Sequence, residues 1–362
     1  LHHIASKSPN QKKGDRNLNR EFSRPLNYRR RLHERRAWQV TLPPMKTQIV
    51  YHPNYNISFF GIERLHPFDS KKYGRAWSLL KERFGPALAD HQIPVDRPVS
   101  DEELLLVHTR EYLESLHSPA NIAAALEVPV LGKLPAGVLS WLVLRPMRWA
   151  ARGSVIAARA ALDNGAAVNL SGGYHHAKPN RGEGFCVFSD IALIVRQLRS
   201  ENLLRPEDSI VCVDLDAHQG NGVCHQFLSD RQFHIFDMYN QSIYPKADFE
   251  ARRRINGNFP LPFACAGGRY LSILHQSLPS FLDSLAEDKP RLAIYNAGTD
   301  VFAGDQLGGL HLSADDILQR DLFVMHEFRR RQIPFVMLLS GGYSRQSYRL
   351  VADTVTKMLD HG

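Results

Sequence analysis

The second half of the chain repeats one pattern: a short apolar run ends in a cluster of polar residues, and a stretch with helical periodicity follows. Short apolar runs rich in β-branched residues predict buried strands. Strands that alternate with helices predict an α/β fold, in which a mainly parallel sheet carries helices on both faces. The five runs, each with its polar cluster, are 166–170 with 171–176, 209–213 with 214–222, 233–236 with 237–240, 291–295 with 296–300, and 335–339 with 340–343.

The segment Asp214-Leu-Asp-Ala-His-Gln-Gly-Asn-Gly222 carries the most chemical information among these clusters. Unpaired charge at the end of a buried strand is costly, so its carboxylates need a purpose. Asp216 and His218 are two residues apart and project to the same side of an extended chain, which suits a divalent metal such as zinc. The alternative is a loop with an Asx-turn and a helix cap.

The other clusters supply further candidates, because the carboxyl ends of parallel strands meet at one edge, where ligands bind. Asp300 follows Gly298 and is the candidate third ligand, although it could instead cap a helix or a turn. Two carboxylates on one metal blunt its acidity, so a separate base becomes useful. His175 and His176 follow a double glycine and could provide that base.

A catalytic histidine needs a partner on its other ring nitrogen, and Asp214 and Asn221 flank the metal ligands as the obvious partners. Tyr343 follows Gly341-Gly342 and could donate its hydroxyl to a substrate oxygen. The alternative for Tyr343 is an aromatic ring packed over the glycines, and for the histidines a satisfied place in the core.

The rest of the chain is expected to extend the same domain, which we place at residues 46–362. Residues 47–51 alternate toward a strand, and 69–84 fit a helix with Asp69 or Ser70 as its N-cap. A capping box at 100–103 and a cap at Thr109 each predict a short helix. Residues 117–146 show no clear pattern and could be a pocket wall or a buried loop. The remaining predicted helices are 150–164, 188–200, 268–287, 313–330 and 345–360.

The positive charge of the chain is confined to its beginning. Residues 1–44 contain 11 Lys/Arg and three Asp/Glu, whereas the remainder contains 34 of each kind. We expect residues 1–45 to be a basic, disordered leader, although such a segment could bind nucleic acid or an anionic surface. The first methionine is Met45, and we hypothesise that translation starts there and that the leader is dispensable.

Two further features bound the class of protein. No run of 18 apolar residues is present, so no membrane span is expected. The four cysteines form no Cys-x-x-Cys pair, and Cys186 and Cys212 lie inside apolar runs. A reducing compartment fits best, namely the cytoplasm, or the nucleus in a eukaryotic host.

Taken together, the motifs resemble those of zinc-dependent histone deacetylases. Asp-Leu-Asp-x-His, Gly-Tyr-His-His-Ala-Lys, Gly-Phe-Cys, Ala-Gly-x-Asp and Ser-Gly-Gly-Tyr occur here in the order of that family, across about residues 47–360. The segments 55–69 and 296–300 look most like its class IV branch. The resemblance implies a single-domain arginase/deacetylase fold with about eight strands, and hydrolysis of the amide of acylated lysine in a protein or peptide.

The resemblance also implies roles for individual residues. Asp216, His218 and Asp300 become the ligands of one zinc ion. His175 and His176 become the tandem catalytic pair, tuned by Asp214 and Asn221, and Tyr343 becomes the carbonyl polariser. Gly184 and Phe185 match a wall of the acyl-lysine tunnel. A structural potassium or sodium site is implied at Asp214, Asp216, His218, Asp237 and Met238.

Three departures from the family pattern affect these expectations. Asn221 stands where many deacetylases have an aspartate, which should lower the pKa of His176. Residues 128–147 lack the acidic residue that grips a peptide backbone, which leaves histone specificity open. Leu307 stands where polyamine deacetylases have a glutamate, so it disfavours polyamines and suits an aliphatic chain. The class IV resemblance implies a preference for long fatty-acyl groups over acetyl.

Other functions fit the sequence less well. Arginase-type chemistry needs an aspartate two residues after the metal-binding histidine, and Gly220 cannot ligate a second metal. A deacetylase of small acetylated amines, such as polyamines, remains an alternative. So does a catalytically silent module that binds acyl-lysine or associates with DNA through the basic leader, although nucleic-acid binding is otherwise not expected.

Overall fold

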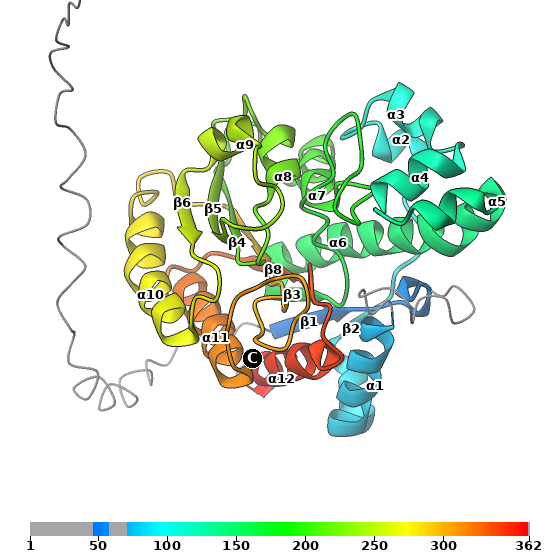
Figure 1. Cartoon of the computed structure of the whole chain (residues 1–362). Helices are drawn as coiled ribbons and strands as arrows, with labels where there is room; N and C mark the ends of the chain where they lie inside the picture. Colours follow the sequence, from blue (N-terminus) through cyan, green and yellow to red (C-terminus); the bar gives the residue numbers. More distant parts are fainter. Residues whose placement is uncertain (1–45, 58–70, 361–362) are drawn as a thin grey trace, which may run out of the picture. The chain divides into compact units, whose positions relative to one another are not determined.

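The computed structural model describes residues 46–57 and 71–360, and its centre is one eight-stranded sheet (Figure 1). The strand order is β2-β1-β3-β8-β7-β4-β5-β6, and all neighbouring strands are parallel. The predicted α/β architecture is therefore confirmed. The strands are β1 (Lys46–Val50), β2 (Gln92–Ile93), β3 (Gly165–Asn169), β4 (Ile210–Asp214), β5 (Phe233–Asn240), β6 (Gly257–Leu261), β7 (Leu292–Asn296) and β8 (Phe335–Leu338).

The central strands form because their residues are apolar on both faces, as expected for a parallel sheet covered twice. Every residue of β4, β7 and β8 is buried. β5 is longer than predicted, since the polar cluster 237–240 continues the strand instead of following it. β2 and β6 were not predicted: β2 has two residues, and β6 contains Pro260, which is tolerated because β6 is an edge strand.

Helices lie on both faces of the sheet (Figure 1). α6 packs against β1, β3 and β8, and α7 packs against α6. α12 packs against β1, and it also contacts α1 and α11. The longer helices are α1 (Lys72–Phe84), α6 (Arg145–Asn164), α7 (Asp190–Ser200), α10 (Gly267–Asp283), α11 (Ala314–Arg330) and α12 (Ser347–Asp360). Within the described ranges, no helix combines the length and apolarity needed to cross a bilayer.

Residues 117–146, which the sequence left without a pattern, are mostly helical. The prolines that obscured the pattern mark helix starts: Pro119 begins α4, Pro129 begins the 3₁₀-helix η5, and Pro135 directly precedes α5. Proline suits the first turn of a helix because the N–H that it lacks has no intrahelical partner there. The elements are α4 (Pro119–Ala125), η5 (Pro129–Lys133), α5 (Ala136–Leu139) and a π-helical turn, η6 (Ser140–Leu144), which runs into α6.

The predicted helix caps are confirmed where the structure describes them. Ser100 and Glu103 form the capping box of α2 (Asp101–Leu104). The Thr109 side chain accepts a hydrogen bond from Tyr112 N at the start of α3 (Arg110–Ser115). The caps predicted at 69–70 lie outside the described residues, as do the leader 1–45 and most of the segment 55–69.

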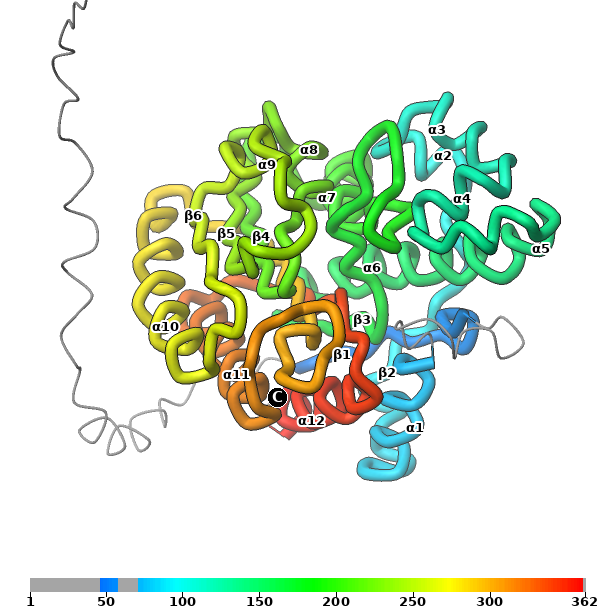
Figure 2. Tube along the Cα trace, viewed as in Figure 1, coloured from blue at the N-terminus to red at the C-terminus, as the bar shows by residue number. Residues whose placement is uncertain are grey.

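The sheet brings the polar clusters to one edge. β3, β8, β7, β4 and β5 are consecutive in the strand order, and their carboxyl ends lead into the loops that carry the candidate residues (Figure 2). Parallel pairing keeps these ends level: Asp214 of β4 is paired with Asn296 of β7 and Asp237 of β5. The topology therefore places all five clusters side by side.

Candidate metal and catalytic site

Asp216, His218 and Asp300 converge after β4 and β7. One potential ligand atom from each lies within 4.8 Å of the other two, and all three residues are buried. His218 Nδ1 lies 3.1 Å from Asp216 Oδ1 and 2.9 Å from Asp300 Oδ2. Two carboxylates and an imidazole nitrogen are a donor set that suits zinc. The donor chemistry of the cluster therefore fits this metal.

Backbone groups hold the two carboxylates in place. Ala217 N donates to Asp300 Oδ1 at 2.9 Å, and Gly341 N donates to Asp216 Oδ2 at 2.8 Å. Gly298 permits this approach, because a Cβ at that position would lie 2.3 Å from Asp216 Oδ2. The loops after β4, β7 and β8 are thus locked to one another through the cluster.

Charges within the cluster shift the pKa values of its members. Burial alone would lower the pKa of His218, but hydrogen bonds and charges from Asp216 and Asp300 raise it to about 10. Burial and the charge of Asp216 raise the pKa of Asp300 to about 7. Two carboxylates this close either share a proton or hold a positive charge between them, and a divalent cation would supply that charge.

The two adjacent histidines are both buried beside this cluster, and their ring centroids are 4.1 Å apart. His175 Nδ1 lies 2.8 Å from Asp214 Oδ2, and His176 Nδ1 lies 2.7 Å from Asn221 Oδ1. These are the pairings expected from the sequence. In both histidines Nδ1 is bonded to its partner. Nε2 of His176 remains for chemistry, whereas Nε2 of His175 lies 3.6 Å from Asp216 Oδ1.

The pairings give the histidines different proton affinities. Burial alone would lower the pKa of His175, but the carboxylates of Asp214 and Asp216 raise it to about 9. Burial and the charges of His175 and His218 hold the pKa of His176 well below its ordinary value. The two imidazoles therefore differ in proton affinity, which suits an acid beside a base.

Tyr343, Phe185 and Gly184 lie around the histidines. The Tyr343 ring centroid is 5.9 Å from that of Phe185 and 6.3 Å from that of His218. Gly184 has a φ of +57°, and a Cβ there would lie 2.4 Å from His176 Cδ2. Only glycine allows the loop to pass so close to the imidazole.

Leu307, the predicted selector of the acyl chain, is half-buried in the loop after Asp300. Its N–H donates to Asp305 Oδ1 at 2.9 Å, and Asp305 Oδ2 accepts a hydrogen bond from Tyr343 N at 2.6 Å. Asp305 therefore joins the Leu307 loop to the Tyr343 loop, and the structure gives no direct contact of Leu307 with the histidines.

The predicted second cation site adjoins the cluster, on β4 and the neighbouring strand β5. Asp214 and Asp237 face each other across β4 and β5, and Met238 follows Asp237 in β5. Gly220 N donates to Asp237 Oδ2 at 3.0 Å, while Asp237 Oδ1 is buried with no hydrogen-bond partner among the described residues. Burial and the charge of Asp214 raise the pKa of Asp237 well above its ordinary value. An orphaned, buried carboxylate oxygen fits a monovalent cation.

Sequence reasoning missed four residues at this site. Lys72 is buried and donates to Ser340 O at 2.8 Å and Gly341 O at 3.0 Å, under the Tyr343 segment. Nothing in the pattern of α1 distinguishes it from a surface lysine. The other three are Glu183, Tyr244 and Arg320.

Arg320 is fully buried in α11, where its guanidinium donates to Leu215 O at 3.0 Å and Gly298 O at 2.7 Å. Tyr244 places its ring centroid 5.0 Å from that of His176. A buried arginine next to Asp321 is hidden in a sequence because Arg-Asp pairs are common on helix surfaces. Tyr244 lies in a loop without periodicity, so no signal separated it from its neighbours.

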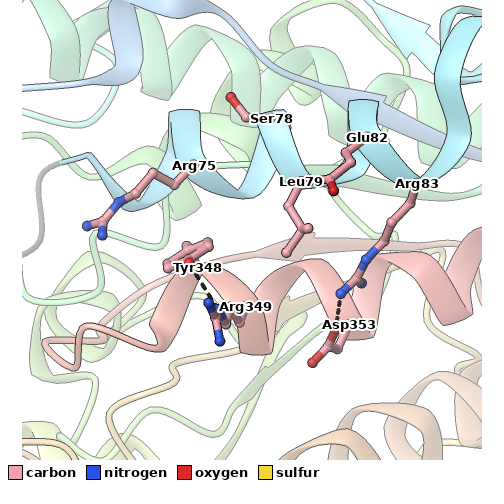
Figure 3. Close-up of a pocket in the computed structure, with 8 residues that line it drawn as sticks. All are labelled: Arg75, Ser78, Leu79, Glu82, Arg83, Tyr348, Arg349 and Asp353. Carbon is pink, nitrogen blue, oxygen red and sulfur yellow. Dashed lines mark hydrogen bonds and ion pairs between the residues drawn. The ribbon is translucent and has the colours of Figure 1, made fainter.

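A groove elsewhere on the molecule shares no residue with this site. It has a volume of about 580 Å³ and lies between α1 and α12, with Arg75, Arg83, Tyr348 and Arg349 among its lining residues (Figure 3). Its polar groups bond within the groove: Arg83 pairs with Asp353, and Arg349 Nε donates to Tyr348 Oη. The convergent polar groups needed for chemistry are at the sheet edge instead.

Comparisons with known proteins agree on one family. The profile of the histone deacetylase domain matches residues 66–359. Histone deacetylase 2 of Arabidopsis thaliana is 40% identical over 323 residues, which cover 89% of this chain and 81% of that protein. An uncharacterized protein of Picosynechococcus is 29% identical over 308 residues, 84% of this chain and 94% of the relative.

Two solved structures share the fold. An HDAC homolog complexed with SAHA superposes with a TM-score of 0.65 at 23% identity, covering 87% of this chain and 83% of that one. The HDA15 HD domain superposes with a TM-score of 0.68 at 19% identity, covering 87% and 89%.

Proposed function

Because the chain belongs to the histone deacetylase family, we propose that it is a zinc-dependent hydrolase of the amide in N-ε-acyl-lysine. The observation that carries the proposal is the buried cluster Asp216, His218 and Asp300, next to two histidines of opposite proton affinity. These three residues would hold the metal, one ion per chain. When bound, zinc would supply a Lewis acid that polarises the amide carbonyl and acidifies water.

The histidines divide the proton transfers. His176 is neutral and directs Nε2 away from Asn221, so it takes a proton from the attacking water. His175 is hydrogen-bonded to Asp214, and this carboxylate stabilises the positively charged form of its imidazole. A histidine of the pair then returns a proton to the lysine amine as the C–N bond breaks, and the acid and free amine leave.

Tyr343 stabilises the charge that develops on the carbonyl oxygen. Burial and the charges of Asp216 and Asp300 raise its pKa well above the ordinary value, so the hydroxyl keeps its proton and can donate. Gly184 and Phe185 form a wall for the lysine side chain against Tyr343.

The substrate class follows from the departures in sequence. We propose that the chain belongs to the class IV branch and accepts long fatty-acyl groups on a protein or peptide lysine, since Leu307 offers an apolar surface instead of a carboxylate. Asp214, Asp237 and Met238 would hold a structural potassium or sodium ion. Residues 46–362 would form the catalytic domain, acting in the cytoplasm or nucleus.

An acyl-chain series tests the proposal. Purified protein is assayed on matched lysine peptides that bear acetyl, octanoyl and myristoyl groups and on an acetylated polyamine, with metal analysis alongside. We expect zinc in the protein and turnover of acyl-lysine, with the higher kcat/KM for the long chains. Zinc without turnover of any substrate would favour a binding module, and turnover of the polyamine alone would overturn the assignment to lysine.

A further inference from the structure

We infer that Glu183 is a positioning residue: its carboxylate orients the Asn221 amide and so sets which ring nitrogen of His176 carries the proton. The contacts form a chain. Glu183 Oε1 accepts a hydrogen bond from Asn221 Nδ2 at 2.6 Å, and Asn221 Oδ1 lies 2.7 Å from His176 Nδ1. The catalytic consequence rests on the proposed function, whereas the protonation pattern does not.

The Glu183 carboxylate fixes the direction of each hydrogen bond in this series of contacts. An amide can be turned by 180° with little change in shape, which exchanges its donor and its acceptor. A carboxylate only accepts, so the Asn221 NH₂ group must face Glu183. Asn221 Oδ1 then faces His176 and only accepts, so His176 Nδ1 must carry the hydrogen. His176 Nε2 is left with its lone pair, the form that a general base requires.

Charged neighbours keep Glu183 in its ionised form. Lys178 Nζ lies 2.8 Å from Glu183 Oε1, and Arg181 Nε donates to Oε2 at 2.9 Å. Burial would raise the pKa of Glu183, but these two cations hold it below the ordinary value. Lys178 also pairs with Asp248 at 2.8 Å, and Asp248 Oδ2 lies 2.9 Å from His225 Nε2.

The backbone around Glu183 is fixed as well. Glu183 N donates to Cys186 O at 3.1 Å, and Cys186 N donates back to Glu183 O at 3.0 Å. This short bridge also carries Gly184 and Phe185 past the histidine. The carboxylate is therefore presented to Asn221 by a rigid turn.

The same contact explains why an asparagine, and not an aspartate, stands at position 221. An aspartate would set two carboxylate oxygens where Asn221 Nδ2 and Glu183 Oε1 are now 2.6 Å apart. Like charges at that distance in a buried site are unfavourable. Asn221 Nδ2 also lies 3.4 Å from Asp248 Oδ2, a second and more distant carboxylate. Neutralising Glu183 should therefore relieve most, but not all, of the cost of Asn221→Asp.

A ¹⁵N NMR measurement of the imidazole nitrogens tests the inference without reference to turnover. The full chain is labelled with ¹⁵N-histidine, and the His176 signals are assigned by their loss in His176→Gln. We expect the Nδ1–H form in the wild type and a shift toward Nε2–H in Glu183→Ala. Glu127→Ala is the matched control, because Glu127 bonds Gly184 N of the same loop but does not contact Asn221; it should leave the Nδ1–H form.

Kinetics on an acyl-lysine peptide supply the second readout. Glu183→Ala should lower kcat by about 10- to 100-fold with little change in KM, as is typical for residues that orient a catalytic group, and Glu183→Gln should recover most of it. Asn221→Asp should be impaired, and the double variant Glu183→Gln/Asn221→Asp should be at least about tenfold more active than Asn221→Asp alone.

The outcomes separate the inference from the proposed function. An unchanged His176 tautomer in Glu183→Ala, or additive losses in the double variant, would overturn the role of Glu183. A changed tautomer in a protein that hydrolyses no acyl-lysine would support that role and refute the hydrolase instead.

Discussion

Among the single residues, Tyr343 is the candidate hydrogen-bond donor to the oxyanion, and its backbone segment is fixed by two neighbouring side chains. Asp305 Oδ2 accepts a hydrogen bond from Tyr343 N, and Lys72 binds the carbonyl groups of Ser340 and Gly341. Burial lowers the pKa of Lys72 to about 8, although the charges of Asp300, Asp216 and Asp305 oppose this shift. The tyrosine therefore sits on a segment whose backbone is fixed before substrate arrives, which is the condition for a preorganised donor.

Removing only the hydroxyl of Tyr343 should slow the reaction and leave the fold intact. We expect Tyr343→Phe to lower kcat by about 10²–10³, the loss typical of one oxyanion donor. Tyr348→Phe is the matched control, since Tyr348 lies five residues further on at the α1–α12 groove and bonds Arg349. Near-wild-type kcat in Tyr343→Phe would remove Tyr343 from the mechanism.

Among the elements of the fold, α11 supports both loops that carry candidate metal ligands, through one side chain. The buried Arg320 guanidinium donates hydrogen bonds to the carbonyls of Leu215 and Gly298, and it pairs with Asp321 at 2.8 Å. Leu215 directly precedes the candidate ligand Asp216, and Gly298 lies two residues before Asp300. Tyr295 and Thr354 complete the surroundings of Asp321 by donating to its two oxygens.

Arg320→Met should destabilise the protein by about 3–5 kcal/mol, because it leaves the Asp321 carboxylate buried without its cation. Urea unfolding measures this loss. Arg205→Met is the control: Arg205 pairs with Asp208 on the surface, where its side chain is 72% exposed, and such pairs contribute at most about 1 kcal/mol. Equal unfolding free energies for the two variants would contradict this account of α11.

The neutral, buried imidazole of His108 joins the segment before α3 to the segment that follows the His175-His176 pair. His108 Nε2 accepts a hydrogen bond from Ser189 N at 3.0 Å, and Nδ1 donates to Pro179 O at 3.3 Å. Burial lowers the pKa of His108 to about 4. An unfolded histidine protonates near pH 6.5, so the stability that His108 contributes is complete above that pH and is lost as pH falls toward 4.

The pH dependence of unfolding tests this assignment. Between pH 7 and pH 5 the wild type should lose about 2 kcal/mol of unfolding free energy more than His108→Gln. The exposed His117 serves as the control, and His117→Gln should follow the wild type. Parallel pH profiles for wild type and His108→Gln would contradict this, because they would show that His108 binds protons equally in the folded and unfolded states.

Much of the fold could be predicted from these elements. Runs such as 209–213 and 335–339 are buried on both faces of the sheet. Their residues are therefore almost continuously apolar, which makes these strands easy to predict. Other features escaped prediction for physical reasons. β2 has only two residues, and β6 contains a proline. The prolines of 117–146 begin helices, but in a sequence they look like breaks. β5 continues through Asp237 to Asn240, although polar residues there look like the end of a strand.

The residues of the candidate site divide in the same way. Asp216, His218 and Asp300 were predictable because polar residues at the ends of buried strands need a reason to be there. Glu183 and Arg320 were not, since each acts through a partner that is distant in sequence: Asn221 for Glu183, and Leu215 O and Gly298 O for Arg320. Sequence reasoning finds groups that touch a substrate more readily than those that position them.

In the whole molecule, the excess positive charge lies in residues 1–44, while residues 45–362 contain equal numbers of basic and acidic side chains. All candidate site residues predicted from the sequence lie within residues 175–343, in strands or in the segments that follow them. A truncated protein that begins at Met45 should therefore keep the kcat/KM of the full chain on an acyl-lysine peptide. Loss of activity on truncation would show that the leader contributes to catalysis.

Under the proposed function, Asp216, His218 and Asp300 hold one zinc ion, and hydrolysis depends on that ion. The most direct measurement is a zinc titration of the chelated protein, with bound metal and turnover of an acyl-lysine peptide followed together. Turnover should be absent at first and rise to a break at about one equivalent of zinc, while Asp300→Ala should neither bind the ion tightly nor recover. Full turnover in the chelated protein, or in zinc-free Asp300→Ala, would contradict the account.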